Sequence, residues 1–347
     1  MFDRRADLSW ILDDFDPSRF QRFHLFGCRP LAAGDDGAGM AHAASRRRGD
    51  TGDEADHRLL HVLLDELGGF FFRITADLAD REAIETLFST HRPESVVHLA
   101  AQAGVRYAAE NPHIYVSSNI TGFLHILEGC RRHNVQHLVY ASTSSVYGAN
   151  KTMPFSEHHP TAHPITLYAA TKKSNELMAH SYAHLYRIPT TGLRFFTVYG
   201  PWGRPDMAYF SFTKALLESR SIDVYNHGQL RRDFTYVDDV VEAIVRLVAC
   251  PPDAARRAAL GDDETAPHLL YNVGNNTPTM LQDFIAILER VTGRTAHRIM
   301  KPMQPGDVLE TYADVTRLAS VTGFAPATPL EVGLTRFVAW YRGYNGP

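Results

Sequence analysis

The sequence has few cysteines and no long apolar run. Cys28, Cys130 and Cys250 are the only cysteines in 347 residues. Their wide spacing is neither a disulfide framework nor a metal signature, and it is typical of a chain in a reducing cytosol. No apolar run approaches the roughly 20 residues that a membrane-spanning helix needs. The opening MFDRRADLSW has acidic residues where a secretory signal has its apolar core. We therefore expect a cytoplasmic protein.

The sequence also lacks a large excess of charge of either sign. Its formal net charge is -4 and its isoelectric point is about 6.5. This balance gives no reason to expect nucleic acid or an anionic membrane as a partner. The 18 histidines show no metal-ligand spacing with acids or cysteines, so we expect no metal.

Residues 1–56 lack the residues of which buried strands are made. They contain no valine, one isoleucine (Ile11) and one threonine (Thr51). Buried parallel strands are normally rich in such β-branched residues. We expect a short helix around residues 8–15, and we do not expect this segment to supply two central strands of a sheet.

From about residue 57, apolar runs of strand length alternate with helical patterns. The runs cover 70–74, 95–101, 137–144 and 190–200, and the helical patterns cover 80–91, 115–134 and 168–186. This alternation predicts an α/β fold with a parallel sheet covered on both faces. The tail predicts a smaller lobe, with helices at 209–219 and 280–293 and an exposed loop at 251–268.

The stretch LYAATKKSNE places a phenol and an ammonium group one helical turn apart. Tyr168 and Lys172 fall on the same helix face. A full charge pair at such a distance is worth roughly 4 kcal/mol, so Lys172 is expected to lower the pKa of Tyr168 and make it a usable general base. Upstream, ASTSSVYG (141–148) ends a predicted strand in hydroxyl groups, at the edge of a parallel sheet where ligands bind. Thr143 is placed to bond the oxygen that Tyr168 deprotonates.

With these motifs, residues 57–345 resemble the extended short-chain dehydrogenase/reductase superfamily, the NAD-dependent epimerase/dehydratase family. Within it they most resemble UDP-glucuronate 4-epimerases. The stretches that carry the resemblance include VVHLAAQAGVRYAAENP, LRFFTVYGPWGRPDMA, NHGQLRRDFTYVDDVVEAI and QPGDVLETYAD. The resemblance implies a Rossmann-like doubly wound sheet, a bound NAD, a UDP-sugar substrate and a homodimer built on the helices 115–134 and 168–186.

The resemblance also implies a role for individual residues. Tyr168 is the catalytic base and acid, Lys172 tunes it and binds the nicotinamide ribose, and Thr143 holds the sugar O4. The cofactor residues would be Asp77 and Leu78 at the adenine, Ala100, Ala101, Gln102, Asn119 and Ser142 along the cofactor, and Phe195 near the nicotinamide. The substrate residues would be Ser144 and Ser145 at the sugar, Thr197 and Arg204 at the C6 carboxylate, Arg232 at the pyrophosphate and Asp307 on the uridine side. Arg106 is a weaker candidate.

Some of these residues have other readings. Arg204 could be a solvated surface arginine, and Arg232 could form a structural ion pair with Asp233 or Asp238. His98 is expected to be a buried core residue. Related dehydratases and decarboxylases carry carboxylates where this chain has Ser144-Ser145, and serine cannot do carboxylate acid–base work at neutral pH. The sequence therefore favours epimerisation, in which C4 is oxidised, the 4-keto sugar turns over, and C4 is reduced on the other face.

One family feature is missing from the sequence. No G-x-x-G-x-x-G stretch occurs, although that loop lets the backbone approach the cofactor pyrophosphate. The nearest stretch, Gly34–Gly39, has the wrong spacing, so the first βαβ unit and the central strand are expected to be missing or aberrant. Either a frameshift or mis-called start has replaced the native N-terminus, or the protein has lost NAD binding. Two rival functions stay open, a nucleotide-sugar binder without activity and a UDP-glucose/galactose-type 4-epimerase.

The sequence thus divides into three expected parts. Residues 1–56 form an atypical N-terminal segment. Residues 57–200 form a Rossmann-like domain with the catalytic tyrosine and lysine. Residues 201–347 form mainly a substrate lobe, with 232–250 returning to the first domain.

Overall fold

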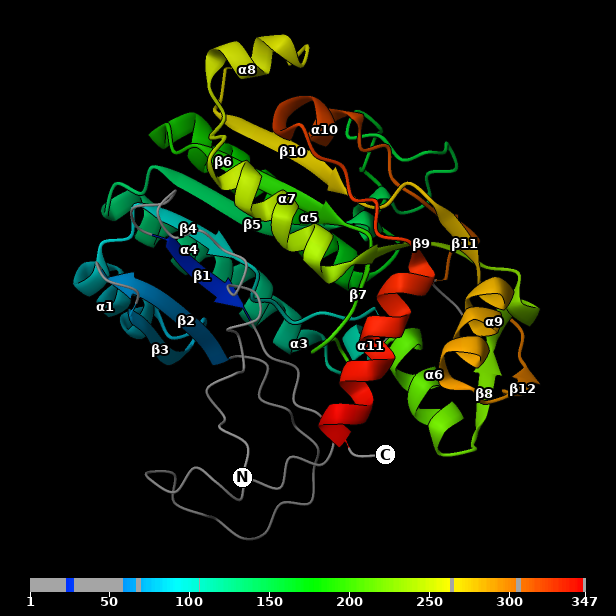
Figure 1. The fold of residues 1–347 in the computed structure, drawn as a ribbon. Helices are drawn as coiled ribbons and strands as arrows, with labels where there is room; N and C mark the ends of the chain where they lie inside the picture. Colours follow the sequence, from blue (N-terminus) through cyan, green and yellow to red (C-terminus); the bar gives the residue numbers. More distant parts are fainter. Residues whose placement is uncertain are drawn as a thin grey trace, which may run out of the picture.

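The computed structural model describes residues 23–27, 59–66, 70–105, 107–262, 265–303 and 307–345, with side chains from residue 74 onward. A seven-stranded sheet runs through the molecule in the order β10-β6-β5-β4-β1-β2-β3 (Figure 1). Its strands are β1 (Phe23–Gly27), β2 (Leu59–Glu66), β3 (Phe70–Asp77), β4 (Ser95–His98), β5 (His137–Thr143), β6 (Thr190–Phe195) and β10 (His268–Val273). The five strands from β10 to β1 are mutually parallel, which confirms the predicted α/β fold.

The N-terminal part of the sheet differs from the expectation. β1 lies beside β4 and runs parallel to it, with Phe23 opposite Ser95, so the expectation that this strand is missing is wrong. β2, which the sequence did not predict, runs antiparallel to both β1 and β3. A βαβ unit joins parallel strands, so β1 and β2 do not form one, and the first unit is aberrant as expected.

Helices cover both faces of the parallel strands because side chains alternate between the faces. Val96 and Leu138 face a core built with α1 (Arg81–His91), α4 (Gly122–Arg132) and α5 (Leu167–Tyr186). Val97 and Val139 face the opposite core, which α7 (Val237–Val248) and α10 (Thr316–Thr322) close. The strand ends that hold the candidate catalytic residues are therefore fixed from both sides.

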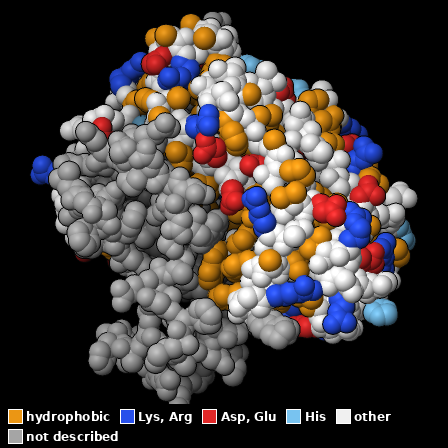
Figure 2. All heavy atoms as spheres, in the orientation of Figure 1, with side chains coloured by type: hydrophobic (Ala, Val, Ile, Leu, Met, Phe, Trp, Pro, Cys, Tyr) orange, Lys and Arg blue, Asp and Glu red, His pale blue; other side chains and the backbone are white. Residues whose placement is uncertain are grey.

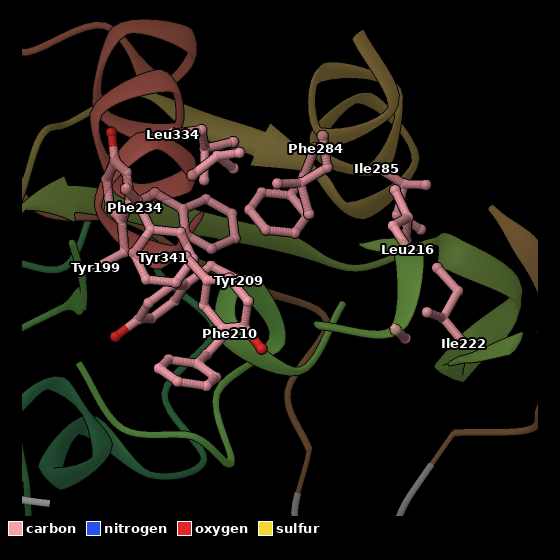
Figure 3. Close-up of a cluster of buried hydrophobic side chains, with 14 of the residues drawn as sticks. Tyr199, Tyr209, Phe210, Leu216, Ile222, Phe234, Phe284, Ile285, Leu334 and Tyr341 are labelled. Carbon is pink, nitrogen blue, oxygen red and sulfur yellow. The ribbon is translucent and has the colours of Figure 1, made fainter. Parts of the chain in front are cut away.

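The second lobe is built on a smaller sheet and a large aromatic cluster. β9 (Arg231–Tyr236) pairs with β7 (Thr197–Tyr199), β11 (Pro278–Met280) and β13 (Glu310–Thr311). Helices α6 (Ala208–Leu217), α9 (Leu281–Thr292) and α11 (Leu330–Asn345) enclose a core that includes Tyr199, Tyr209, Phe284 and Leu334 (Figure 3). β8 (Ser221–Val224) and β12 (His297–Met300) form a separate parallel pair.

A buried carboxylate joins distant parts of this lobe. Asp233 on β9 is fully buried, and its oxygens accept hydrogen bonds from the backbone N–H groups of Asn275 (2.9 Å), Asn276 (3.0 Å) and Ala313 (3.0 Å). Asn275 and Asn276 are consecutive and Ala313 lies far along the chain, so the carboxylate fixes two chain segments to one strand.

Short helices complete the structure: α2 (Tyr107–Glu110), α3 (Pro112–Tyr115), the π-helix η4 (Val116–Thr121), the 3₁₀ helices η5 (Ser144–Tyr147) and η6 (Tyr225–Gly228), and α8 (Ala254–Ala259). The sequence predicted an exposed loop over 251–268, and α8 corrects this. Asp253 caps α8 by accepting the Arg256 N–H at 2.7 Å. This N-cap bond stabilises a short helix directly after two prolines.

The described surface carries both signs of charge. In Figure 2, lysine and arginine side chains lie among aspartate and glutamate side chains on the visible face. Across the described ranges no helix is long and apolar enough to cross a membrane, and no cluster of three or more metal-binding side chains occurs.

Candidate active site

Three candidate catalytic side chains meet at the carboxyl end of the parallel strands. Thr143 is the last residue of β5, and Tyr168 lies in the first turn of α5, which Thr166 caps through its hydroxyl. A side-chain hydrogen bond joins Thr143 to the Tyr168 phenol. Lys172 follows one turn later and is 2% exposed. The structure thus joins Thr143 to Tyr168 and places Lys172 one turn along the same helix, and the catalytic role of the three residues stays a prediction.

The electrostatics of Tyr168 differ from the expectation. Burial raises the pKa of Tyr168, while the Arg204 guanidinium and the Thr143 hydrogen bond oppose this rise. The prediction that Lys172 lowers the pKa of Tyr168 is wrong for this structure. Helical spacing identified the neighbours of Tyr168 along its own helix, but burial and a cation from a distant loop have the larger effects.

Lys172 is buried one turn after Tyr168 on α5. Burial lowers the pKa of Lys172 to about 8, and the nearby Glu176 carboxylate opposes this shift. His98, at the end of β4, is buried and stacks on Phe123 with ring centroids 5.4 Å apart, which fits the predicted core role. Burial and then the charge of Lys172 lower the pKa of His98 to about 3, so its ring is neutral at neutral pH.

Asn119 joins the loop after β4 to helix α5. Its Oδ1 accepts the Gln102 N–H at 2.8 Å, and its Nδ2 donates to Gln102 O and Thr171 Oγ1, both at 3.0 Å. Asn119 belongs to the π-helix η4, a distortion that often marks functional sites. Gln102 Oε1 is buried without a hydrogen-bond partner among the described residues, as expected of a group that awaits a ligand.

Arg204 lies beside this catalytic face. It donates from Nε to Asp206 Oδ1 at 3.0 Å and from Nη2 to Asp206 Oδ2. A Cβ atom on Gly104, whose φ is +107°, would lie 3.1 Å from Arg204 Nη2. The guanidinium is therefore held against the loop after β4 and is paired with an aspartate, so Arg204 is not simply a solvated surface residue.

Arg232 does not form either of the ion pairs considered from the sequence. Asp233 accepts backbone amides, and Asp238 accepts from Arg336 at 3.5 Å. Arg232 Nη1 donates to Arg231 O at 2.8 Å, while burial lowers the pKa of Arg232 and the charge of Asp307 opposes this. Arg232 and Asp307 are thus electrostatic neighbours on the second lobe.

The other candidate residues lie along strand ends and the loops that follow them. Asp77 ends β3 and accepts the Ala79 N–H at 2.9 Å, and Leu78 is buried against helix α4. Ser144 and Ser145 open η5, and Ser145 accepts a hydrogen bond from Thr143 at 3.2 Å. Ala100 and Ala101 follow β4, Ser142 and Phe195 lie on β5 and β6, and Thr197 lies on β7. Arg106 and Gly34–Gly39 lie outside the described residues.

Sequence reasoning missed three residues of this region. Tyr115 packs edge-on against Tyr168, with centroids 6.2 Å apart, and donates to Gly104 O at 2.6 Å. Glu176 and Arg194 form a buried ion pair behind the catalytic helix. Only Glu176 left a signal in the sequence, because it follows Lys172 by four residues on the same helix face.

The described residues fit one half of a dinucleotide. Donors, acceptors and positive charge lie at the strand ends, where such a cofactor's reactive end binds in this type of fold, and come from buried Lys172, Gln102 and Asn119 and half-buried Tyr168. By contrast, no part of the described chain is a glycine-rich turn from a strand to a parallel crossover helix, the usual pyrophosphate site.

Comparisons with known proteins identify relatives that are NAD-dependent epimerases or dehydratases. The family model described as "NAD dependent epimerase/dehydratase family" matches residues 34–258. A probable UDP-glucuronate 4-epimerase of Rhizobium meliloti is 49% identical over 286 residues, 81% of this chain and 84% of that protein.

Two solved structures are also similar. The UDP-glucuronic acid 4-epimerase of Bacillus cereus, in complex with UDP-glucuronic acid and NAD, has a TM-score of 0.68 and 30% identity over 77% of this chain and 80% of that one. The UDP-glucose 4-epimerase of Thermotoga maritima, with UDP-glucose, has a TM-score of 0.69 and 31% identity over 77% and 83%. The predicted resemblance is confirmed, and this chain belongs to the NAD-dependent epimerase/dehydratase family.

Proposed function

We propose that this chain is a nucleotide-sugar 4-epimerase that interconverts UDP-glucuronate and UDP-galacturonate. The observation that carries the proposal is the Arg204 guanidinium beside the Tyr168 phenol, which offers a cationic partner for a sugar carboxylate next to the catalytic face. The named relative in Rhizobium meliloti and the Bacillus cereus structure support the same substrate.

The catalytic residues would act as follows. Tyr168 takes the proton of the C4 hydroxyl, and Thr143 holds the C4 oxygen through its side chain. NAD, when bound, would accept the C4 hydride. Burial keeps Tyr168 protonated at neutral pH, and the Arg204 guanidinium and the Thr143 hydrogen bond oppose this effect on its pKa. Lys172 would hold the nicotinamide ribose. After the 4-keto sugar has turned over, the hydride would return to the opposite face of C4 and Tyr168 would return the proton to the C4 oxygen, so no net oxidation occurs.

The substrate end would be held by the second lobe. Arg232 is half-buried and has no carboxylate ion pair within the described ranges, so its guanidinium is available to a pyrophosphate. Asp307 would contact the uridine side, and Thr197 would assist Arg204. Ser144 and Ser145 would contact the sugar. Neither serine supplies a carboxylate, so dehydration and decarboxylation lack their acid–base group.

Replacing Arg204 by methionine tests the substrate assignment. The KM for UDP-glucuronate should rise by about 10- to 100-fold, because a hydrogen bond to a charged group contributes about 1.5–3 kcal/mol. The KM for UDP-galactose should change little. Steady-state kinetics with both sugars measure this, and Arg220→Met is the matched control, because Arg220 pairs with Glu218 two residues away on an exposed turn. An equal rise for both sugars would favour a UDP-glucose/galactose-type enzyme instead.

A second candidate function is a nucleotide-sugar binder without turnover. It is favoured by the antiparallel pairing of β1 and β2 and by the lack of a G-x-x-G-x-x-G stretch, since both remove the usual pyrophosphate site. The purified chain should be denatured and its supernatant assayed for NAD. Near-stoichiometric NAD is expected of the epimerase. No released NAD, together with no uptake on titration, would support the binder.

A further inference from the structure

A buried glutamate lies directly behind the catalytic residues of α5. Glu176 follows Tyr168 by eight residues and Lys172 by four, so the three side chains share one face of the helix. Its side chain is 2% exposed. A carboxylate at such a position requires a partner for each oxygen.

Both oxygens of Glu176 are fully engaged. Arg194 on β6 donates from Nε to Oε1 at 2.9 Å and from Nη2 to Oε2 at 3.0 Å. Ser142 on β5 donates to Oε1 at 2.8 Å, and Lys173 donates to Oε2 at 3.0 Å. Burial alone would raise the pKa of Glu176, but these donors and charges lower it to about 2. The group is therefore a carboxylate at every working pH.

The partners of Glu176 are sequence neighbours of the candidate site residues. Ser142 directly precedes Thr143 on β5, and Arg194 directly precedes Phe195 on β6. One carboxylate thus links the helix that carries Tyr168 and Lys172 to the two strand ends that face it. Because bidentate pairing with a guanidinium has a fixed geometry, the link sets both distance and orientation.

The link continues to a third strand. Arg194 Nη1 donates to the Tyr147 phenol oxygen at 3.1 Å, and that phenol donates to Asn272 Oδ1 on β10 at 2.6 Å. Asn272 Nδ2 in turn donates to Phe155 O at 2.8 Å. A continuous polar chain therefore runs across the catalytic side of the sheet from α5 to β10.

We propose that Glu176 and Arg194 are a positioning pair, which holds Tyr168 and Lys172 in reacting geometry against Thr143 and Phe195. The role in turnover rests on the proposed epimerase function. A buried ion pair contributes little net stability compared with well-packed apolar side chains of similar volume. The pair can instead fix the positions of the reacting side chains. This has a large effect on turnover, because a displacement of about 1 Å can cost about 100-fold in rate.

The pair also acts on Lys172 through its charge. The groups that face Lys172 are Glu176 on its own helix and His98 from β4. His98 is neutral at neutral pH, so Glu176 is the charged neighbour that favours the ammonium form. Removal of its carboxylate should make Lys172 lose its proton at a lower pH.

The double variant Glu176→Leu/Arg194→Met separates positioning from stability. It removes both buried charges at once, so the melting temperature should stay close to that of the unchanged protein. Turnover of UDP-glucuronate should fall by about 100-fold with little change in KM. The matched control is Glu331→Leu/Arg290→Met, which removes an exposed inter-helix pair at 2.9 Å and should leave turnover unchanged. A folded double variant whose turnover stays within about threefold of the original would overturn the proposal.

A second readout does not depend on epimerase activity. The chain has five lysines, so the ¹⁵Nζ resonance of Lys172 can be assigned by its loss in Lys172→Met and then titrated by NMR. The titration should move to lower pH in the double variant and in Glu176→Gln, which keeps the side-chain shape if the double variant does not fold. An unchanged titration would overturn the charge effect. If the original protein shows no turnover, the proposed function fails, and the titration alone then decides whether Glu176 acts on Lys172.

Discussion

Replacement of Tyr168 by phenylalanine should lower the turnover of UDP-glucuronate by about 10²- to 10⁴-fold, the usual contribution of a positioned proton-transfer group. The substitution removes one oxygen atom and leaves the ring in contact with Tyr115. Because Thr143 and Lys172 stay in place, binding of the nucleotide sugar should change little. Steady-state turnover and calorimetric titration with UDP-glucuronate measure the two effects separately.

The matched control for this substitution is Tyr186→Phe. Tyr186 ends the same helix but is exposed, far along the helix from the catalytic turn. Its loss of a hydroxyl should not affect turnover. Undiminished turnover in Tyr168→Phe would exclude Tyr168 as the catalytic acid and base.

Acidification should destabilise the fold well before its carboxylates are protonated. Burial lowers the pKa values of His98, His137 and His268 to about 3, 4 and 3, from the ordinary value of 6.5. Their folded pKa values are below the unfolded value, so their contribution is complete above pH 6.5 and is lost as the pH falls toward 4. Each of these histidines should therefore lower the free energy of unfolding by about 2 kcal/mol at pH 5 relative to pH 7.

Chemical denaturation between pH 7 and pH 5 measures this loss. His98→Phe, which keeps an aromatic ring against Phe123, should remove about a third of the pH dependence. His297→Gln changes an exposed residue of β12 and should leave the pH dependence as it was. If the free energy of unfolding falls equally between pH 7 and pH 5 in the unchanged protein and in both variants, groups other than His98 cause the acid sensitivity.

The sequence predicted those parts of the structure that depend on local periodicity. The strand at 137–144 and the helix at 168–186 correspond to β5 and α5, and the helical spacing of Tyr168 and Lys172 placed both on one face of that helix. The carboxyl end of β5 followed from the parallel-sheet rule, which located Thr143. These predictions used only short-range patterns and one general rule of topology.

The rest depends on contacts between distant residues. Arg194 lies 18 residues after Glu176, beyond a helix end and a turn, so no spacing rule pairs them. The rise in the pKa of Tyr168 follows from burial by surrounding segments, which a helical pattern does not describe. β1 formed in a segment without valine, because pairing with β4 can override weak strand propensity.

The Ala313 amide bound by Asp233 also sets when the fold can be completed during synthesis. A ribosome-bound chain that has emerged only as far as residue 300 holds the Asp233 carboxylate without Ala313, one of its backbone donors. Asn272 likewise lacks its bond to Asp314 O, which measures 3.2 Å in the finished protein. Domains tend to fold in order of emergence from the ribosome. Here residues 313 and 314 would complete contacts of two earlier segments, so both lobes would mature together only after residue 314 has emerged.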